Sequence, residues 1–150
     1  MEDEPLDPVR REARGLERES LDRELGHRRA AEFWGRVHLG LGLPSVVLAA
    51  LAGTSALAEF DNSNLIAAIL ALAVAVLSAL STFLNPSGTA DLHRKASDVY
   101  HSICARARQL TTIDPRSDDE IRQSVYELTK EFNDQIAASP QLSSRWLQNL

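Results

Sequence analysis

Two uninterrupted apolar runs constrain the fold of this chain more than any other feature. Residues 39–58 read LGLGLPSVVLAALAGTSALA, and residues 65–84 read LIAAILALAVAVLSALSTFL. Neither run contains an ionisable side chain. As an α-helix, each run is about 30 Å long, which is the thickness of the hydrocarbon core of a bilayer. In the second run, leucine and valine occupy every side of the helix, whereas a soluble helix normally keeps a polar face. The runs therefore predict two transmembrane helices.

The link between the runs predicts how the two helices are oriented. Residues 59–64 read EFDNSN and carry the acids Glu59 and Asp61 but no base. So short a link holds the helices antiparallel and adjacent. Basic residues flank the outer ends of the runs, and such flanks stay in the cytoplasm. We therefore expect a transmembrane hairpin with both termini cytoplasmic. The basic residues are Arg23, Arg28, Arg29, Arg36, Arg94, Lys95, Arg106 and Arg108.

Two other interpretations of the runs are open. Ala56-Leu57-Ala58 is typical of a signal-peptidase site, which would make the first run a cleaved signal. The long, acid-rich and helix-favouring segment before the run argues against cleavage. Alternatively, the runs form a buried hairpin in a soluble protein. In a chain of 150 residues, however, the outer helices hardly suffice to cover two such helices on all sides.

Helical segments with apolar stripes flank the hairpin in the sequence. Residues 9–38 favour a helix that leads into the first span. Asn85-Pro86-Ser87-Gly88 interrupts the chain after the second span, and residues 89–138 favour two more helices, with Ser117 and Glu120 as a capping box. We expect one all-α domain over residues 1–150, with amphipathic cytoplasmic helices that pack on one another. The stripes are Val9, Ala13, Leu16, Leu21 and Leu25, then Leu92, Ala96, Val99, Ile103, Ala107 and Leu110, then Ile121, Val125, Leu128, Phe132 and Ile136.

The charge pattern and the single cysteine exclude several classes of function. The net charge is −5, and bases and acids nearly balance in both flanks, whereas nucleic-acid binding needs a clustered basic excess. Cys104 stands alone, so no disulfide framework exists. His93, His101 and Cys104 lack the close spacing of a zinc site. Since the sequence has no phosphate loop and no catalytic triad, we expect that the chain is not an enzyme and holds no cofactor or metal. For His93 we expect a structural or pH-sensitive role.

Small and hydroxyl residues within the runs are candidates for helix packing or for lining a pore. Small residues at every fourth position let helix backbones approach closely. Their simplest use is packing within the hairpin, and additional small positions indicate packing between subunits or a lumen. Glu59 and Asp61 would favour cations at an outer mouth, and Gly40, Gly42 and Pro44 would form a hinge or a fixed kink. The packing or pore candidates are Ser45, Ala49, Gly53, Ala71, Ala75, Ser78, Ala79, Ser81 and Thr82.

After the second run, Phe83-Leu84-Asn85-Pro86 is followed by Ala90, His93, Ala96, Tyr100 and Arg106. This pattern resembles the SLATT family, small bacterial proteins with two transmembrane helices that are associated with SMODS nucleotidyltransferases and SLOG domains. The similarity covers roughly residues 30–136. Its motif residues in this chain are Pro86, His93, Tyr100 and Arg106.

The resemblance implies a homo-oligomeric effector in the bacterial inner membrane that acts in anti-phage or other conflict systems. Such effectors are thought to form pores, or otherwise breach the membrane, after an upstream sensor produces a nucleotide signal. The implied partners are the lipid bilayer, further copies of the chain, and that signal or a cytoplasmic sensor protein. The alternative is a non-conducting membrane scaffold or adaptor that docks a cytoplasmic partner.

Overall fold

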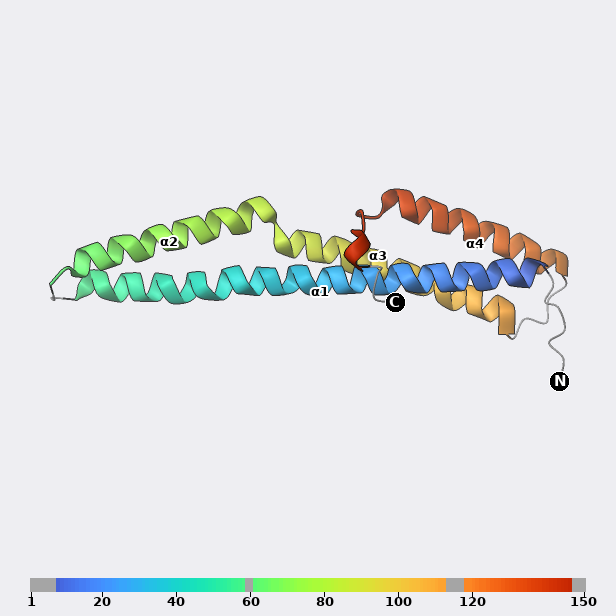
Figure 1. Cartoon of the computed structure of the whole chain (residues 1–150), viewed down its shortest axis with the longest axis horizontal. Helices are drawn as coiled ribbons and strands as arrows, with labels where there is room; N and C mark the ends of the chain where they lie inside the picture. Colours follow the sequence, from blue (N-terminus) through green and yellow to red (C-terminus); the bar gives the residue numbers. More distant parts are fainter. Residues whose placement is uncertain (1–7, 59–60, 113–117, 147–150) are drawn as a thin grey trace. The chain divides into compact units, whose positions relative to one another are not determined.

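The computed structural model describes residues 8–58, 61–112 and 118–146, and the regular secondary structure of these residues is helical, without a strand (Figure 1). The helices are α1 (Pro8–Leu57), α2 (Ser63–Leu84), α3 (Pro86–Thr112), α4 (Asp118–Ala138) and the short 3-10 helix η1 (Ser144–Trp146). The predicted all-α class is therefore confirmed. Ser117, the expected cap of the last long helix, lies outside the described residues.

α1 is a single helix of 50 residues. The segment expected over residues 9–38 and most of the first apolar run therefore belong to one element. Pro44 lies inside this helix without ending it. Next to it, Ser45 Oγ donates a hydrogen bond of 2.7 Å to the carbonyl oxygen of Leu41, which satisfies the hydroxyl within an apolar stretch.

Asn85 ends α2 and caps the start of α3. α2 ends at Leu84, as expected, and Asn85 follows in the left-handed conformation with a φ of 41°. Its side-chain oxygen accepts a hydrogen bond of 3.3 Å from the backbone N–H of Gly88. Pro86 takes the first helical position, where no N–H is needed, so α3 starts before the predicted Thr89. A Cβ at Gly88 would lie 2.5 Å from the Asn85 side chain, so a larger residue here would displace the capping amide.

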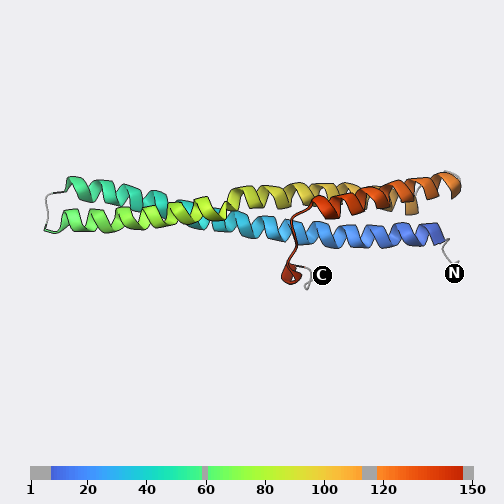
Figure 2. The same cartoon turned by 90° about the horizontal axis from the view of Figure 1, so that it is seen from above.

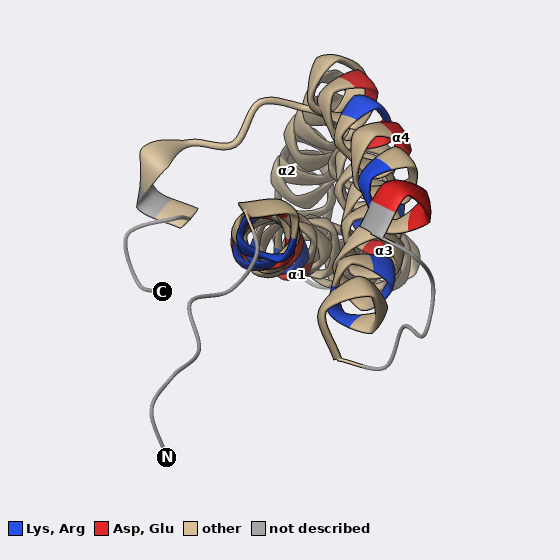
Figure 3. Ribbon diagram, turned by 90° about the vertical axis from the view of Figure 1, so that its right-hand side faces the viewer, with Lys and Arg blue, Asp and Glu red and all other residues tan. Residues whose placement is uncertain are grey.

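The structure divides into two compact units. One holds Met1–Ala31 and Asp91–Leu150 and is called the bundle; the other holds Glu32–Ala90 and is called the apolar unit. Within the bundle, the first half of α1 lies beside α3 and α4 (Figures 1 and 2). Basic and acidic residues are interleaved along these helices (Figure 3). The bundle therefore presents a surface of mixed charge.

Apolar side chains from three helices form the core of the bundle. The buried positions of α3 and α4 repeat at steps of three and four residues. Two residues of the expected stripes are instead exposed, Leu21 by 37% and Leu92 by 56%. His93 is in line with Ala96 and Tyr100, so the preceding Leu92 is turned away by about 100°. The core consists of Ala13, Leu16, Ala96, Tyr100, Ile103, Ala107, Leu110, Ile121, Val125, Leu128 and Phe132.

Within the apolar unit, α2 lies beside the second half of α1 in both views (Figures 1 and 2). Partly covered residues repeat along each helix at steps of three and four, as in two helices in lengthwise contact. Most other residues of the two runs are exposed. The repeating positions are Leu41, Ser45, Leu48, Ala52 and Ser55 in α1, and Ala67, Leu70, Val74, Leu77 and Ser81 in α2.

Two helical stretches are long and apolar enough to cross a membrane: α1 and the stretch that begins at Ser63. No part of the most apolar 18-residue window is buried in either of them. The core helix of a soluble protein would bury most of such a window, because apolar residues concentrate in protein interiors. This exposure argues against the alternative of a buried hairpin in a soluble protein.

Replacement of Ile103 with alanine should destabilise the bundle, because Ile103 is fully buried in its core. The loss of a buried isoleucine side chain lowers the free energy of unfolding by about 2–5 kcal/mol. Leu92→Ala, on the same helix, is the matched control and should change that free energy by less than about 0.5 kcal/mol. Urea unfolding of the full chain in detergent micelles, followed by circular dichroism, measures both. Equal losses for the two variants would contradict the assigned core.

Candidate functional site: a buried histidine pair

Two histidines from different helices meet inside the bundle. His27 belongs to α1 and His93 to α3, and the residues are only 1% and 5% exposed. Their Nδ1 atoms are 2.8 Å apart, which is hydrogen-bond distance. One Nδ1 must carry the hydrogen while the other offers its lone pair. The contact therefore requires that at least one of the two rings is neutral.

Aromatic rings from two helices adjoin the histidine pair. The His27 ring stacks on Tyr100 of α3, with centroids 5.5 Å apart and an angle of 15° between the rings. Tyr100 in turn meets Phe132 of α4 edge to face, with a centroid distance of 5.8 Å. All three long helices of the bundle thus contribute to this cluster. Such a surrounding favours the uncharged form of imidazole.

Glu24, almost one turn before His27, connects α1 to α3 twice. Its backbone carbonyl accepts a hydrogen bond of 3.2 Å from Ser97 Oγ, and its carboxylate lies 3.1 Å from Nδ1 of His101. The neighbouring Arg23 guanidinium lies 5.4 Å from the centroid of the Phe132 ring. The charged groups beside the histidine pair are therefore Arg23, which pairs with Glu19 at 3.2 Å, and the Glu24 carboxylate, which already contacts His101.

Burial keeps both histidines of the pair neutral at physiological pH. Burial, then the neighbouring His93 and then the Arg23 cation lower the pKa of His27 from 6.5 to about 4. Burial likewise lowers the pKa of His93 below its usual 6.5. Both shifts have the sign that desolvation imposes on a cationic acid. The folded pair therefore takes up protons less readily than two exposed histidines.

The structure brings together two of the four family-motif residues and separates the others. His93 and Tyr100 both lie in the buried cluster. Arg106 is further along α3, where it forms an ion pair with Glu131 of α4. Pro86 is buried in the apolar unit, at the start of α3.

Sequence reasoning missed His27, although a signal for it is present. Positions 13, 16, 20, 23, 27 and 30 repeat at steps of three and four, and most of them are buried. The expected stripe left this line after Leu16, because it followed the apolar residues Leu21 and Leu25 instead. Ser20 and His27 continue the buried face with polar side chains, which a search for apolar periodicity passes over.

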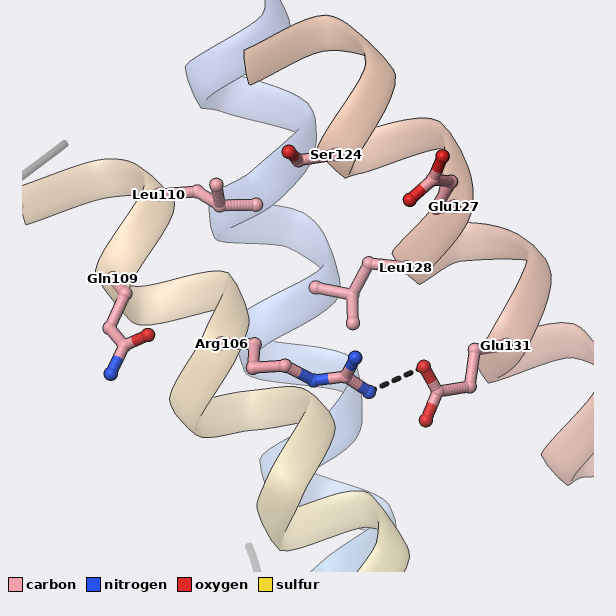
Figure 4. Close-up of a pocket in the computed structure, with 7 residues that line it drawn as sticks. All are labelled: Arg106, Gln109, Leu110, Ser124, Glu127, Leu128 and Glu131. Atoms are coloured by element: carbon pink, nitrogen blue, oxygen red, sulfur yellow. Dashed lines mark hydrogen bonds and ion pairs between the residues drawn. The ribbon is translucent and has the colours of Figure 1, made fainter. Parts of the chain in front are cut away.

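A pocket of about 330 Å³ lies between α3 and α4 (Figure 4). Figure 4 shows Arg106 reaching across it to Glu131, with Leu110 and Leu128 beside them. The one cation in the lining is thus already paired, and Glu127 adds a second carboxylate. Phosphate recognition relies on charge-assisted donors that are free to pair with the phosphate. This pocket is therefore a poor match for the expected nucleotide signal.

The packing and pore candidates divide into two groups. Ser45 and Ser81 lie on the partly covered faces where α1 and α2 meet. The other small candidates lie outside this face of α1 and α2. The exposed candidates are Ala49, Gly53, Ala71, Ala75, Ser78, Ala79 and Thr82.

The remaining candidates lie at the ends of the runs. Gly40 and Pro44 are exposed and Gly42 is partly covered, all within the unbroken α1. Asp61 is exposed, and Glu59 lies outside the described residues. Cys104 is buried in the bundle, and burial raises the pKa of its thiol. Among the described residues, no three His, Cys, Asp or Glu side chains are grouped so that they could hold a metal.

Tyr100→Phe and Tyr100→Ala should differ strongly in stability. Phenylalanine keeps the ring stack on His27 and loses only the hydroxyl, whose contact with Ser139 Oγ is 3.4 Å long. We expect Tyr100→Phe to lower the free energy of unfolding by about 0.5–1.5 kcal/mol. Tyr100→Ala removes the ring and leaves a cavity, at a loss of about 3–5 kcal/mol. The same urea unfolding in micelles measures both, and equal losses would assign the stabilisation to the hydroxyl instead of the stack.

Comparisons of the chain with protein-family models, with curated proteins and with solved structures found no match. The similarity to the SLATT family therefore rests on the pattern of residues alone. Within that pattern, the two motif residues that meet in space, His93 and Tyr100, are the two that belong to the buried histidine cluster.

Proposed function

We propose that this chain is a homo-oligomeric membrane effector that permeabilises the bacterial inner membrane. In this proposal α2 and the second half of α1 form a transmembrane hairpin, and the bundle lies in the cytoplasm. The observation that carries the proposal is the exposure of both apolar windows. The trigger implied by the family resemblance, a nucleotide signal, belongs to the proposal as well.

The composition of the exposed faces supports a position in lipid. Leu43, Val46 and Leu72 are each more than 60% exposed, and they belong to runs without a charged side chain. Contiguous apolar surface of this extent is rare on soluble proteins and is typical of surfaces that contact a membrane or another protein. Basic residues outside the runs and acids in the link between them support cytoplasmic termini.

The surface of α2 supports association between copies. At 100° per residue, its exposed residues fall on two sides of the helix. Within the apolar run, one side carries small residues or hydroxyls, namely Ala68, Ala71, Ala75, Ser78, Ala79 and Thr82. The other carries large apolar residues, namely Ile69, Leu72, Val76, Leu80 and Phe83. In a bilayer, small sides pack against other helices and large sides suit lipid. A single hairpin cannot enclose a water path, so permeation requires several copies.

The full chain should stay with the membrane after extraction at high pH. Alkaline carbonate strips peripheral proteins, whereas apolar spans stay in lipid because their transfer to water is unfavourable. The measurement is fractionation of expressing cells followed by intact-mass analysis of the pellet. A compact monomer in the supernatant would refute the membrane assignment. A mass that begins after Ala58 would identify the first run as a cleaved signal.

Ala75→Leu should reduce the size of the assembly, because leucine on the small side of α2 prevents close approach of a second helix. Val76→Leu is the matched control, since it places the same side chain on the large side. Light scattering in nanodiscs or detergent gives the number of copies, and potassium efflux from liposomes reports permeation. We expect Ala75→Leu to lose the assembly and the potassium efflux, and Val76→Leu to keep them. Equal effects of the two variants would exclude this side as the interface. A wild-type chain that assembles but releases no potassium would favour the alternative function, a non-conducting membrane scaffold or adaptor.

A further inference from the structure

The histidine pair lies close in sequence to both apolar runs. His27 precedes Leu39, the start of the first run, by 12 residues within the unbroken α1. His93 follows Leu84, the end of the second run, by nine residues, in the first half of α3. Each histidine therefore sits on the helix that leads into or out of one run. A change in the contact between α1 and α3 at this point acts on both helices.

We propose that the His27–His93 pair is a proton-operated latch that holds α1 against α3 at neutral pH and releases them in acid. The proposed consequence, a change in permeation by the apolar runs, rests on the function proposed above. When both rings are protonated, each Nδ1 carries a hydrogen and neither offers a lone pair. The 2.8 Å contact then becomes a repulsion between two cations.

The groups around the pair favour release over a charged, closed state. On α1, Arg23 adds a positive charge near His27 while it pairs with Glu19 at 3.2 Å, and the Glu24 carboxylate is engaged with His101 of α3. From α3, Tyr100 presents its ring to His27, and the Ser97 hydroxyl donates to the Glu24 carbonyl. From α4, Phe132 reaches Tyr100. Among the described residues, no carboxylate contacts either ring of the pair, so an added proton has no counter-charge in place.

The sign of the response follows from the lowered pKa values. The closed bundle binds fewer protons than an open one, whose histidines titrate near 6.5. Stability of the closed state is therefore complete above about pH 6.5 and falls as the pH drops below 6.5, with the contribution of His27 lost down to about pH 4. Each histidine raises the open-to-closed ratio by at most about tenfold per pH unit within this window. For His27 the shift corresponds to a total of about 300-fold.

Cys104 is a built-in reporter for this opening. It is the only cysteine of the chain, it is 4% exposed, and it lies on α3 near the charges of Glu17 and Glu24 of α1. Separation of α1 from α3 exposes its thiol. The full chain in nanodiscs is treated with 4,4′-dithiodipyridine, which reacts in acid as well as at neutral pH. At each pH, the rate is divided by the rate for the urea-unfolded chain.

We expect the normalised rate of the wild-type chain to rise at least about tenfold between pH 7.5 and 5.0. His27→Gln/His93→Gln, whose amides can bond to each other but do not titrate, should stay within about twofold. His38→Gln is the matched control, because His38 is an exposed histidine of α1 outside the contact between α1 and α3, and it should respond like wild type. A flat wild-type profile, or an unchanged response in the double variant, would overturn the latch. Loss of the response in His101→Gln alone would overturn it too, by moving the proton site to the contact with Glu24.

The latch can still be tested if the variant His27→Gln/His93→Gln does not fold. In that case its rate at pH 7.5 equals that of the unfolded chain, and the single variant His27→Gln takes its place. The part of the response that His27 contributes should then disappear, and a full response would overturn the proposal. The thiol assay needs no conduction. If the thiol becomes reactive in acid but the liposomes release no potassium, the latch stands and the proposed pore is refuted. If the liposomes release potassium but the thiol reactivity does not change with pH, the pore stands and the latch is refuted.

Discussion

The exclusion of water from two long apolar helix surfaces is the constraint on which the rest of the structure depends. Each run is free of charge over about 30 Å, and contact between α1 and α2 covers only one narrow face of each. Apolar surface contributes roughly 25 cal/mol per Å² when it leaves water, so the exposed sides are far more stable in lipid. The bundle, in contrast, buries its apolar residues against one another and interleaves charges outside. The two units thus suit two different solvents.

The difference between the bundle and the apolar unit also explains why small residues have different roles along the chain. In the bundle, Ala13, Ala96 and Ala107 are fully or almost fully buried and let the helices approach one another. On α2, Ala71, Ala75 and Ala79 are exposed and are gathered on one side. Lipid gives no hydrophobic drive to helix association, so close backbone approach along such a side is a main source of contact energy there. The same residue type therefore fills a core in one unit and, in the proposed assembly, forms an interface in the other.

Sequence periodicity predicted the elements better than it predicted the cluster at the centre of the bundle. The end of α2 at Leu84 followed from Pro86, and Ile121, Val125, Leu128 and Phe132 are buried as a helical stripe requires. Leu21 and Leu92 were assigned to stripes because they are apolar, yet Ser20 and His93 take the buried positions beside them. Burial of a polar residue depends on a partner, and the partner of His93 lies 66 residues away. Apolar patterns are local, whereas such a pairing is set by the tertiary fold.

A polar pair inside a helical bundle is an expensive way to gain stability, which is why its presence points to a role in release. Apolar residues of similar volume often stabilise a core as well as or better than a buried polar network. This bundle goes further, because Ser20 Oγ and Thr129 Oγ1, among the described residues, are buried without a hydrogen-bond partner. Each such group lowers stability by about 1–3 kcal/mol. These groups lower the stability of the closed bundle, which favours the proposed release when the two histidines are protonated.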